Sequence, residues 1–403
     1  MRPSQISILI MLLASVPLLS PSAIAQAEER VIYAFSECGE PIAPLITDSQ
    51  RNLYGTTTGG GAYEGGCVFE LSPVEGGGWS ESVLLNLDGV GGAHGALVFD
   101  KAGNLYGTGP GIAFELSPSA EGGWSETVLH SFGSGDDGSG DESNLIFDDA
   151  GNLYGTTSSG GARRGGTVFE LSPGQDGWRE TILYSFPGSV SGPNGDSPAG
   201  GLVMDREGRL YGVTEFGGAG GDGAVFELVP SDGGYKERLV HSFDINDGLQ
   251  PTSGLAADRS GNLYGTTSAG GDASVCYYVG CGIVFELTRG PDGNWTEKVL
   301  HELNGSDGFN AVGPPVIDPA GNVYAAAMSG GIQAGSVFEL TPTASGPWKE
   351  TVLHLFDFKF PNGEDGESPY AGVTLYRDRV FGTTSGGGVH NAGTVFEIIP
   401  RVF

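Results

Sequence analysis

The sequence predicts an all-β fold, a seven-bladed β-propeller of four-stranded antiparallel blades. Three observations lead to this prediction. A motif of the type Asn-Leu-Tyr-Gly-Thr-Thr occurs seven times, at spacings of 48 to 60 residues. Short apolar segments bounded by Gly, Pro, Asp or Asn surround each copy and show no helical period. Glycine supplies 72 of the 403 residues while the hydrophobic share is 38%, which indicates turns in a folded chain rather than disorder.

Each repeat unit is expected to contribute four strands, which we call a, b, c and d. In the second unit, strand a ends at Asp100, strand b covers 104–108, strand c contains Phe114 and strand d lies within 124–132. The a–b link has Gly103 where a tight hairpin needs a positive φ. Consecutive antiparallel strands repeated in this way are typical of propellers, whose blades bury their faces against neighbouring blades. The seven b strands begin at positions 52, 104, 152, 209, 262, 322 and 379.

The two ends of the chain predict that the ring is closed. Residues 29–35 align with strand d of the later units, so the mature protein is expected to begin with a strand d. The last unit has strands a (373–376), b (379–384) and c (394–398), with no strand d after them. Pairing residues 31–35 with 394–398 completes the seventh blade and removes an exposed sheet edge.

Residues 1–25 have the features of a secretory signal peptide. Arg2 precedes a mostly apolar run over 8–19, and Ala23-Ile24-Ala25 fits the small-x-small cleavage pattern. The run is shorter than the about 20 residues that a membrane-spanning helix needs. We therefore expect cleavage after Ala25, one propeller domain over 26–403, and a secreted, periplasmic or cell-surface protein that does not insert into the membrane.

The composition and the missing motifs limit the function. The formal net charge is −30, so nucleic acids and anionic lipids are poor partners, because the electrostatic attraction that drives both has the wrong sign. The sequence carries no recognised nucleophile motif, dinucleotide fingerprint, phosphate loop or zinc-ligand spacing.

The repeat resembles a known family. Tandem units reading Gly-Asn-Leu-Tyr-Gly-Thr-Thr, then Gly-Gly-x-Val-Phe-Glu-Leu-Ser-Pro, then Trp-x-Glu-Thr-Val-Leu-His-Ser-Phe are similar to the GloVer repeat of the "choice-of-anchor tandem repeat GloVer-containing" proteins. The clearest matches are 151–173 with 178–186, and 261–287 with 295–303. The resemblance extends over about 29–400 and implies an exported bacterial repeat protein. It transfers no catalytic residues.

Two series of glutamates and one of histidines recur at equivalent positions. We interpret the glutamates as blade-to-blade hydrogen-bonding groups, because catalysis needs one or two groups in distinct environments. The strand c series is Glu70, Glu115, Glu170, Glu227, Glu286, Glu339 and Glu397, and the strand d series is Glu29, Glu81, Glu126, Glu180, Glu237, Glu297 and Glu350. The histidines His130, His241, His301 and His354 share one strand d position with Tyr33, Leu85 and Tyr184. A position that accepts Leu and Tyr predicts packing, not metal ligation.

The b–c and d–a links are expected to share one face of the ring, and their varied lengths favour this face for binding. Several d–a links are rich in Asp and Gly, and oxygen ligands at short spacing suit Ca²⁺, although Asp-Gly is also a plain turn former. The binding candidates on this face are His94, Asp136, Asp137, Asp196, Asp247, Asp307, Asp365 and His390. The calcium hypothesis concerns Asp136, Asp137, Asp141 and Glu142.

Four cysteines in an exported chain predict two disulfides. Cys276 and Cys281 share one b–c loop, while Cys38 lies in the first d–a link and Cys67 begins the first strand c. The other two pairings would cross from the first unit to the fifth, farther than the about 7 Å that a disulfide can bridge between Cα atoms. We predict Cys276–Cys281 and Cys38–Cys67.

The sequence therefore predicts a monomeric, exported propeller that binds a protein or a carbohydrate through its long-loop face, and we lean away from an enzyme. The alternative is a hydrolase or lyase acting on a sugar or lactone, with Ca²⁺ as its candidate cofactor. Two or three acids and a histidine converging in the channel would favour the alternative.

Overall fold

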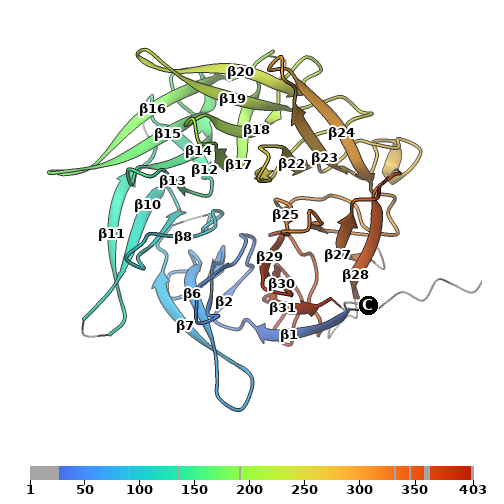
Figure 1. Cartoon of the computed structure of the whole chain (residues 1–403). Helices are drawn as coiled ribbons and strands as arrows, with labels where there is room; N and C mark the ends of the chain where they lie inside the picture. The colour runs from blue at the N-terminus through green and yellow to red at the C-terminus, as the bar shows by residue number, and fades with distance from the viewer. Residues whose placement is uncertain are drawn as a thin grey trace, which may run out of the picture.

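The computed structural model describes residues 27–89, 91–120, 122–133, 136–189, 192–330, 333–344, 346–357 and 364–400. The signal peptide predicted over 1–25 lies outside these residues. Seven four-stranded antiparallel sheets are arranged around a central axis as a β-propeller (Figure 1). This confirms the predicted fold class. Within the described residues, no helix is long and apolar enough to cross a membrane.

Each blade carries strands a to d from the axis outward (Figure 1). The a strands are β3 (Ile46–Thr47), β8 (Val98–Phe99), β13 (Ile146–Phe147), β17 (Asp196–Met204), β21 (Ala256–Ala257), β25 (Val316–Ile317) and β29 (Val373–Tyr376). The b strands are β4 (Leu53–Thr56), β9 (Leu105–Gly109), β14 (Leu153–Gly160), β18 (Leu210–Phe216), β22 (Leu263–Thr266), β26 (Val323–Ala327) and β30 (Arg379–Thr384).

The c strands are β6 (Cys67–Pro73), β10 (Ile112–Pro118), β15 (Arg164–Gly174), β19 (Ala224–Ser231), β23 (Ile283–Arg289), β27 (Gln333–Thr341) and β31 (Thr394–Ile399). The outer d strands are β7 (Trp79–Asn86), β11 (Trp124–Ser131), β16 (Gly177–Pro187), β20 (Gly234–Ser242), β24 (Trp295–Glu302), β28 (Lys349–Asp357) and β1 (Glu28–Ala34). Four short elements lie in the links. Strand β2 (Cys38–Gly39) pairs with β5 (Gly59–Gly60), β12 (Gly138–Glu142) pairs with β14, and η1 (Cys276–Tyr278) is a 3-10 turn. We number the blades 1 to 7 from β3–β7 to β29–β31.

The ring closes as the sequence predicts. Strand β1 pairs antiparallel with β31, with Val31 opposite Phe396 and Ala34 opposite Thr394. Blade 7 therefore takes its outer strand from the N-terminal end of the described chain. Because β1 covers the outer edge of β31, blade 7 has the same four strands as every other blade.

The repeated motif places similar contacts in most blades, although blade 6 has Ala325, Ala326 and Ala327 in place of the glycine and the two threonines. In blade 1, a Cβ added to Gly55 would lie 2.7 Å from the Phe69 ring, so the strand b glycine makes room for the strand c phenylalanine. The first threonine of the motif bonds to the next blade, as Thr56 Oγ1 does to the Gly95 carbonyl at 3.2 Å. The second threonine bonds within its own b–c loop, as Thr57 Oγ1 does to Gly59. Thus the motif specifies both the blade and its junction with the next blade.

The core lies between blades, in seven buried clusters. One cluster joins Val168 of blade 3 to Phe226 of blade 4, and both side chains are fully buried. Phenylalanines at the ends of the d strands extend this core across the junctions. Phe243 of blade 4, for example, lies 5.1 Å from Phe285 of blade 5 between ring centroids. Each blade is therefore stabilised chiefly by its two neighbours.

Both predicted disulfides are confirmed. Cys38 bonds to Cys67 with a Cα–Cα distance of 5.9 Å, and Cys276 bonds to Cys281 at 5.2 Å. The first bond fastens the first d–a link to strand β6, and the second closes the loop that contains η1.

Candidate functional site

A funnel opens at the axis of the ring on the face of the b–c and d–a links. Its cavity measures about 290 Å³ and is lined by the d–a links of all seven units. The links reach the axis through small residues packed against each other. A Cβ on Gly200, for example, would lie 2.1 Å from the backbone nitrogen of Gly254 in the next link. Threonines of the b strands hold the links in place, as Thr156 does by bonding to the Gly200 carbonyl at 3.3 Å.

One register position of the d–a link varies more than its surroundings. It lies three residues before the first large apolar residue of strand a, which is Leu in five units, Val in the seventh and Pro in the sixth. From blade 1 to blade 7 the variable position holds Ile42, His94, Glu142, Ala199, Thr252, Val312 and Tyr370. All except Glu142, whose side chain lies outside the description, line the funnel. The seven units therefore supply different chemistry at equivalent places around one cavity.

The funnel has an apolar sector and a polar sector. Val312, Tyr370 and Ile42 come from the consecutive blades 6, 7 and 1 and form the apolar sector. His94 of blade 2 and Glu215 of strand β18 in blade 4 lie in the polar sector. Among the described lining residues, Glu215 supplies the one carboxylate. Burial raises its pKa above the ordinary value, because the low-dielectric surroundings disfavour the charged form.

Of the predicted binding residues, His94 alone lines this funnel. His390 is exposed in the b–c loop of blade 7 and Asp136 is exposed in a d–a link. Asp196 is buried at the start of β17, where burial raises its pKa, and the Ser197 hydroxyl lies 3.4 Å from its Oδ1 atom.

The carboxylate of Glu215 was not among the predicted residues. Aligning the units could have found it. The position after the second threonine of the motif holds Thr58, Ser158, Ser268 or Ser385 in four other units and Met328 in blade 6, so the acid stands out.

Four of the predicted aspartates meet the strand d histidines at the outer junctions between blades. The Nε2 atom of the histidine lies 3.0 to 3.4 Å from a carboxylate oxygen of the aspartate in each pair. The pairs are His130–Asp137, His241–Asp247, His301–Asp307 and His354–Asp365. The four histidines lie at four separate junctions, and each has a carboxylate partner in addition to the packing that we predicted.

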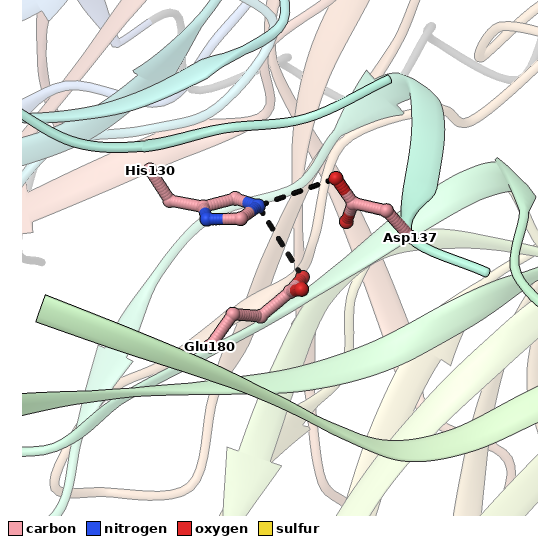
Figure 2. A group of neighbouring side chains, drawn as sticks. All are labelled: His130, Asp137 and Glu180. Atoms are coloured by element: carbon pink, nitrogen blue, oxygen red, sulfur yellow. Dashed lines mark hydrogen bonds and ion pairs between the residues drawn. The ribbon is translucent and has the colours of Figure 1, made fainter. Parts of the chain in front are cut away.

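A glutamate from the next blade completes these junctions. Figure 2 shows His130 between Asp137 and Glu180, with its Nε2 atom 3.3 Å and 3.6 Å from their oxygens. Burial, together with the hydrogen bond and the charge of Asp137, raises the pKa of Glu180 to about 8. Burial likewise raises the pKa of Glu237 and Glu297 to about 7. Glu81 accepts a hydrogen bond from Tyr33 of blade 7 at 2.6 Å, but Glu180, Glu237 and Glu297 each keep one buried oxygen without a hydrogen-bond partner. The blade-to-blade hydrogen-bonding role of the whole series therefore stays a prediction.

The described residues contain two groups in which a histidine and two acids could hold one metal ion: His130, Asp137 and Glu180, and His301, Asp307 and Glu350. Both groups include an imidazole nitrogen, whereas Ca²⁺ prefers oxygen ligands throughout. The side chains of Asp141 and Glu142 lie outside the description. The four-acid Ca²⁺ hypothesis therefore stays a prediction.

The strand c glutamates bond within and between blades. Glu339 accepts a hydrogen bond from Tyr324 of its own strand b at 3.1 Å. In blade 7, the fully buried Glu397 binds Arg379 of strand b, Arg30 of strand d and Arg51 of blade 1. Glu397 thus ties the last blade to the first.

A larger cavity of about 900 Å³ lies on the opposite face, beside the a–b turns of blades 3 to 5. Two of the four arginines that line it pair with nearby acids. Arg209 pairs with Asp205 at 2.5 Å and with Glu207 at 2.8 Å, and Arg289 lies 3.6 Å from Glu227. We therefore place the candidate site in the smaller funnel, where the units differ most.

Comparisons with known proteins support the repeat and the fold. A family model described as the Gloeobacter/Verrucomicrobia repeat matches residues 108–279 and 240–402. The comparison with curated proteins finds no match.

Three of the similar solved structures illustrate the fold. Virginiamycin B lyase from Staphylococcus aureus is 11% identical with a TM-score of 0.55, over 93% of this chain and 99% of that one. An extracellular domain from B. thetaiotaomicron is 10% identical with a TM-score of 0.56, over 92% of this chain and 40% of that one. A protein from Lactobacillus plantarum is 13% identical with a TM-score of 0.53, over 79% and 86% of the two chains. At these identities the likeness concerns the fold alone.

Proposed function

Because the chain belongs to the Gloeobacter/Verrucomicrobia repeat family and its repeats vary most around one funnel, we propose that it is an exported carbohydrate-binding propeller. The variable ring is the observation that carries this proposal. A scaffold position serves every blade alike and keeps one residue type. A position at which six lining residues include Ile42, His94, Thr252 and Tyr370 serves a single asymmetric ligand instead.

The chemistry of the funnel fits a sugar. A sugar ring has an apolar C–H face and a rim of hydroxyls, and the funnel offers both kinds of partner. Tyr370, which is 38% exposed, provides an amphipathic ring beside Val312 and Ile42. His94 and Glu215 on the polar side provide a nitrogen and a carboxylate for the hydroxyls. A cavity of about 290 Å³ is at the small end of ligand pockets, which suits one or two sugar rings.

The surrounding face supports binding of a longer chain. Exposed apolar side chains on the b–c links of the same face include Tyr63 at 62%, Tyr278 at 84% and Val389 at 67%. The two disulfides rigidify links on this face and agree with an oxidising compartment outside the cytoplasm. A monomer is sufficient for this role, because all seven links come from one chain.

A glycan array probed with the mature protein, residues 26–403, tests the proposal. We expect a defined set of neutral or weakly charged glycans to bind, and Tyr370→Ala to weaken binding by at least about tenfold, as loss of an aromatic anchor does. Tyr63→Ala, on the same face but outside the funnel, is the matched control and should leave binding within about twofold. Binding that Tyr370→Ala leaves intact, or an array with no bound glycan, contradicts the proposal.

The second candidate function is a lyase or hydrolase acting on a sugar or lactone, and Glu215 is the observation that favours it. A carboxyl group with a raised pKa in a cavity suits proton transfer. Most glycosidases use two carboxyl groups that flank the scissile bond. The described residues that line the funnel include one carboxyl group, that of Glu215. Incubating each bound glycan with the protein and with Glu215→Gln separates the two: turnover that this substitution abolishes would establish the enzyme.

A further inference from the structure

The junction of blades 2 and 3 brings together three metal-ligating side chains from three separate segments (Figure 2). His130 lies on β11, Asp137 in the d–a link that follows it, and Glu180 on β16 of the next blade. The ligand atoms of the three residues all lie within 4.8 Å of one another. This cluster lies at the outer strands, away from the funnel, and serves neither proposed function.

The cluster is not satisfied by its own hydrogen bonds. The Nε2 atom of a neutral imidazole can donate one proton at most, and the geometry directs it to Asp137 Oδ2. Glu180 Oε1 is then buried without a hydrogen-bond partner, although it lies 3.6 Å from the same nitrogen. An unpaired buried oxygen is costly, and a cation that contacts both carboxylates and the imidazole would compensate it.

The two distances from the histidine match the spacing of ligands around a tetrahedral zinc ion. Zn²⁺ binds nitrogen and carboxylate oxygen at about 2.0–2.2 Å, so tetrahedral ligand atoms are about 3.3–3.6 Å apart. The distances from His130 Nε2 are 3.3 Å to Asp137 and 3.6 Å to Glu180. An imidazole nitrogen with two carboxylates favours a transition metal over Ca²⁺. The three side chains are 15 to 23% exposed, so an ion can reach them from solvent.

We propose that His130, Asp137 and Glu180 bind a Zn²⁺ ion that clamps blade 2 to blade 3. The corresponding group in blades 5 and 6, His301, Asp307 and Glu350, is a second and weaker site. There His301 Nε2 lies 3.0 Å from Asp307 but 4.0 Å from Glu350, so the glutamate must move to complete the ligand set.

The other junctions provide natural controls. His241 and His354 each pair with an aspartate, but the strand d glutamates opposite them, Glu297 and Glu29, are not within the ligand spacing of the two groups above. At the remaining three junctions the histidine position holds Tyr or Leu. The fold already accepts tyrosine at this position, as Tyr184 of blade 3 shows. His130→Tyr therefore removes the metal ligand and should preserve the fold.

The experiment uses the untagged mature protein, stripped with a chelator and titrated with ZnCl₂ by isothermal titration calorimetry, with CaCl₂ in parallel. We expect one tight and one weaker Zn²⁺ site, no comparable Ca²⁺ binding at the cluster, and a melting temperature that rises with Zn²⁺. Loss of a residue that only hydrogen-bonds to a metal ligand typically lowers the metal affinity about 10–100-fold. His130→Tyr and Glu180→Gln each remove a ligand itself, so each should lower the Zn²⁺ affinity of the tight site by at least that factor. His241→Tyr should leave both sites unchanged.

The variants also guard against a folding artefact. His130→Tyr should melt at the same temperature as the parent when both are free of metal, and should lose only the increase that Zn²⁺ produces. A parent protein that binds no Zn²⁺ at micromolar concentration overturns the proposal, as does Zn²⁺ binding that His130→Tyr leaves unchanged. Either result would mean that a shared proton, not a metal, neutralises the two carboxylates.

Discussion

Ring closure depends on one buried carboxylate, and replacing Glu397 with Gln tests this dependence. Its side chain is fully buried and contacts three guanidinium groups, with Arg51 of blade 1 at 2.7 Å. Burial alone would raise the pKa of Glu397, but the hydrogen bonds and charges of Arg379 and Arg30 outweigh it and lower the pKa. The amide would leave three cations facing a neutral group. Breaking a buried ion pair costs about 3–5 kcal/mol, and the partly exposed arginines place the expected loss near about 3 kcal/mol.

Chemical denaturation followed by tryptophan fluorescence measures this loss. The matched control is Glu286→Gln in blade 5, because Glu286 occupies the equivalent position and accepts a hydrogen bond from Tyr264 at 2.9 Å. Within the described residues it forms no ion pair with an arginine. We expect the control to cost about 1 kcal/mol, as loss of one hydrogen bond does. The lowered pKa of Glu397 stabilises the fold above pH 4.5 and loses this effect as the pH falls. The stability difference between the parent and Glu397→Gln should therefore shrink in acid. Equal losses in Glu397→Gln and Glu286→Gln would refute the reasoning.

Two further predictions concern a buried acid and the disulfides. Burial raises the pKa of Glu237 from 4.5 to about 7, so its protonated form stabilises the fold at acid pH and this effect is lost as the pH rises toward 7. The stability of Glu237→Gln relative to the parent should therefore increase by about 1 kcal/mol between pH 5 and pH 8, after discounting for the partial exposure of the side chain. Urea denaturation measures this difference, and a difference that does not change with pH would contradict the prediction. Replacing Cys38 and Cys67 by Ser should cost about 3.6 kcal/mol for a separation of 29 residues, against about 2 kcal/mol for Cys276 and Cys281 with a separation of 5, in calorimetric melts. An equal or reversed order would show that strain or residual structure outweighs chain entropy.

The fold could be predicted from the sequence because each blade repeats the same local code. Gly55 makes room for Phe69, and Thr56 and Thr57 bond to the next link and to their own loop. These contacts recur with the motif, so counting motifs counts blades. The disulfides were predictable for a related reason: the order of units around a ring fixes which cysteines can be near one another.

The candidate site was harder to predict because its residues meet across units. His94 was singled out as an irregular loop residue, but Tyr370 and Glu215 were not, since neither belongs to a motif. The histidine position was interpreted as packing because Leu and Tyr also occur there. The sequence did contain the missing signal. Each of the four strand d histidines is followed by an Asp-Gly pair in the next d–a link. In the unit with Tyr184, the link has Asn194-Gly195 instead, and the Asn194 amide lies 3.4 Å from the tyrosine hydroxyl. Covariation between units thus reports contacts that the composition of either position alone conceals.

This difference between positions locates function within the repeat. A position within the motif has similar surroundings in every blade, so the residue found there reflects the packing that a blade requires. A residue at the variable position shares one cavity with five described residues from other blades, so its identity reflects what occupies that cavity. Val312, Tyr370 and Ile42 lie on consecutive blades and are all apolar or aromatic, so one side of the funnel differs chemically from the other. If the ring only supported structure, changing Tyr370 to Thr, the residue that blade 5 carries at position 252, would be neutral in every assay. The carbohydrate proposal requires instead that this exchange leave stability unchanged and abolish glycan binding.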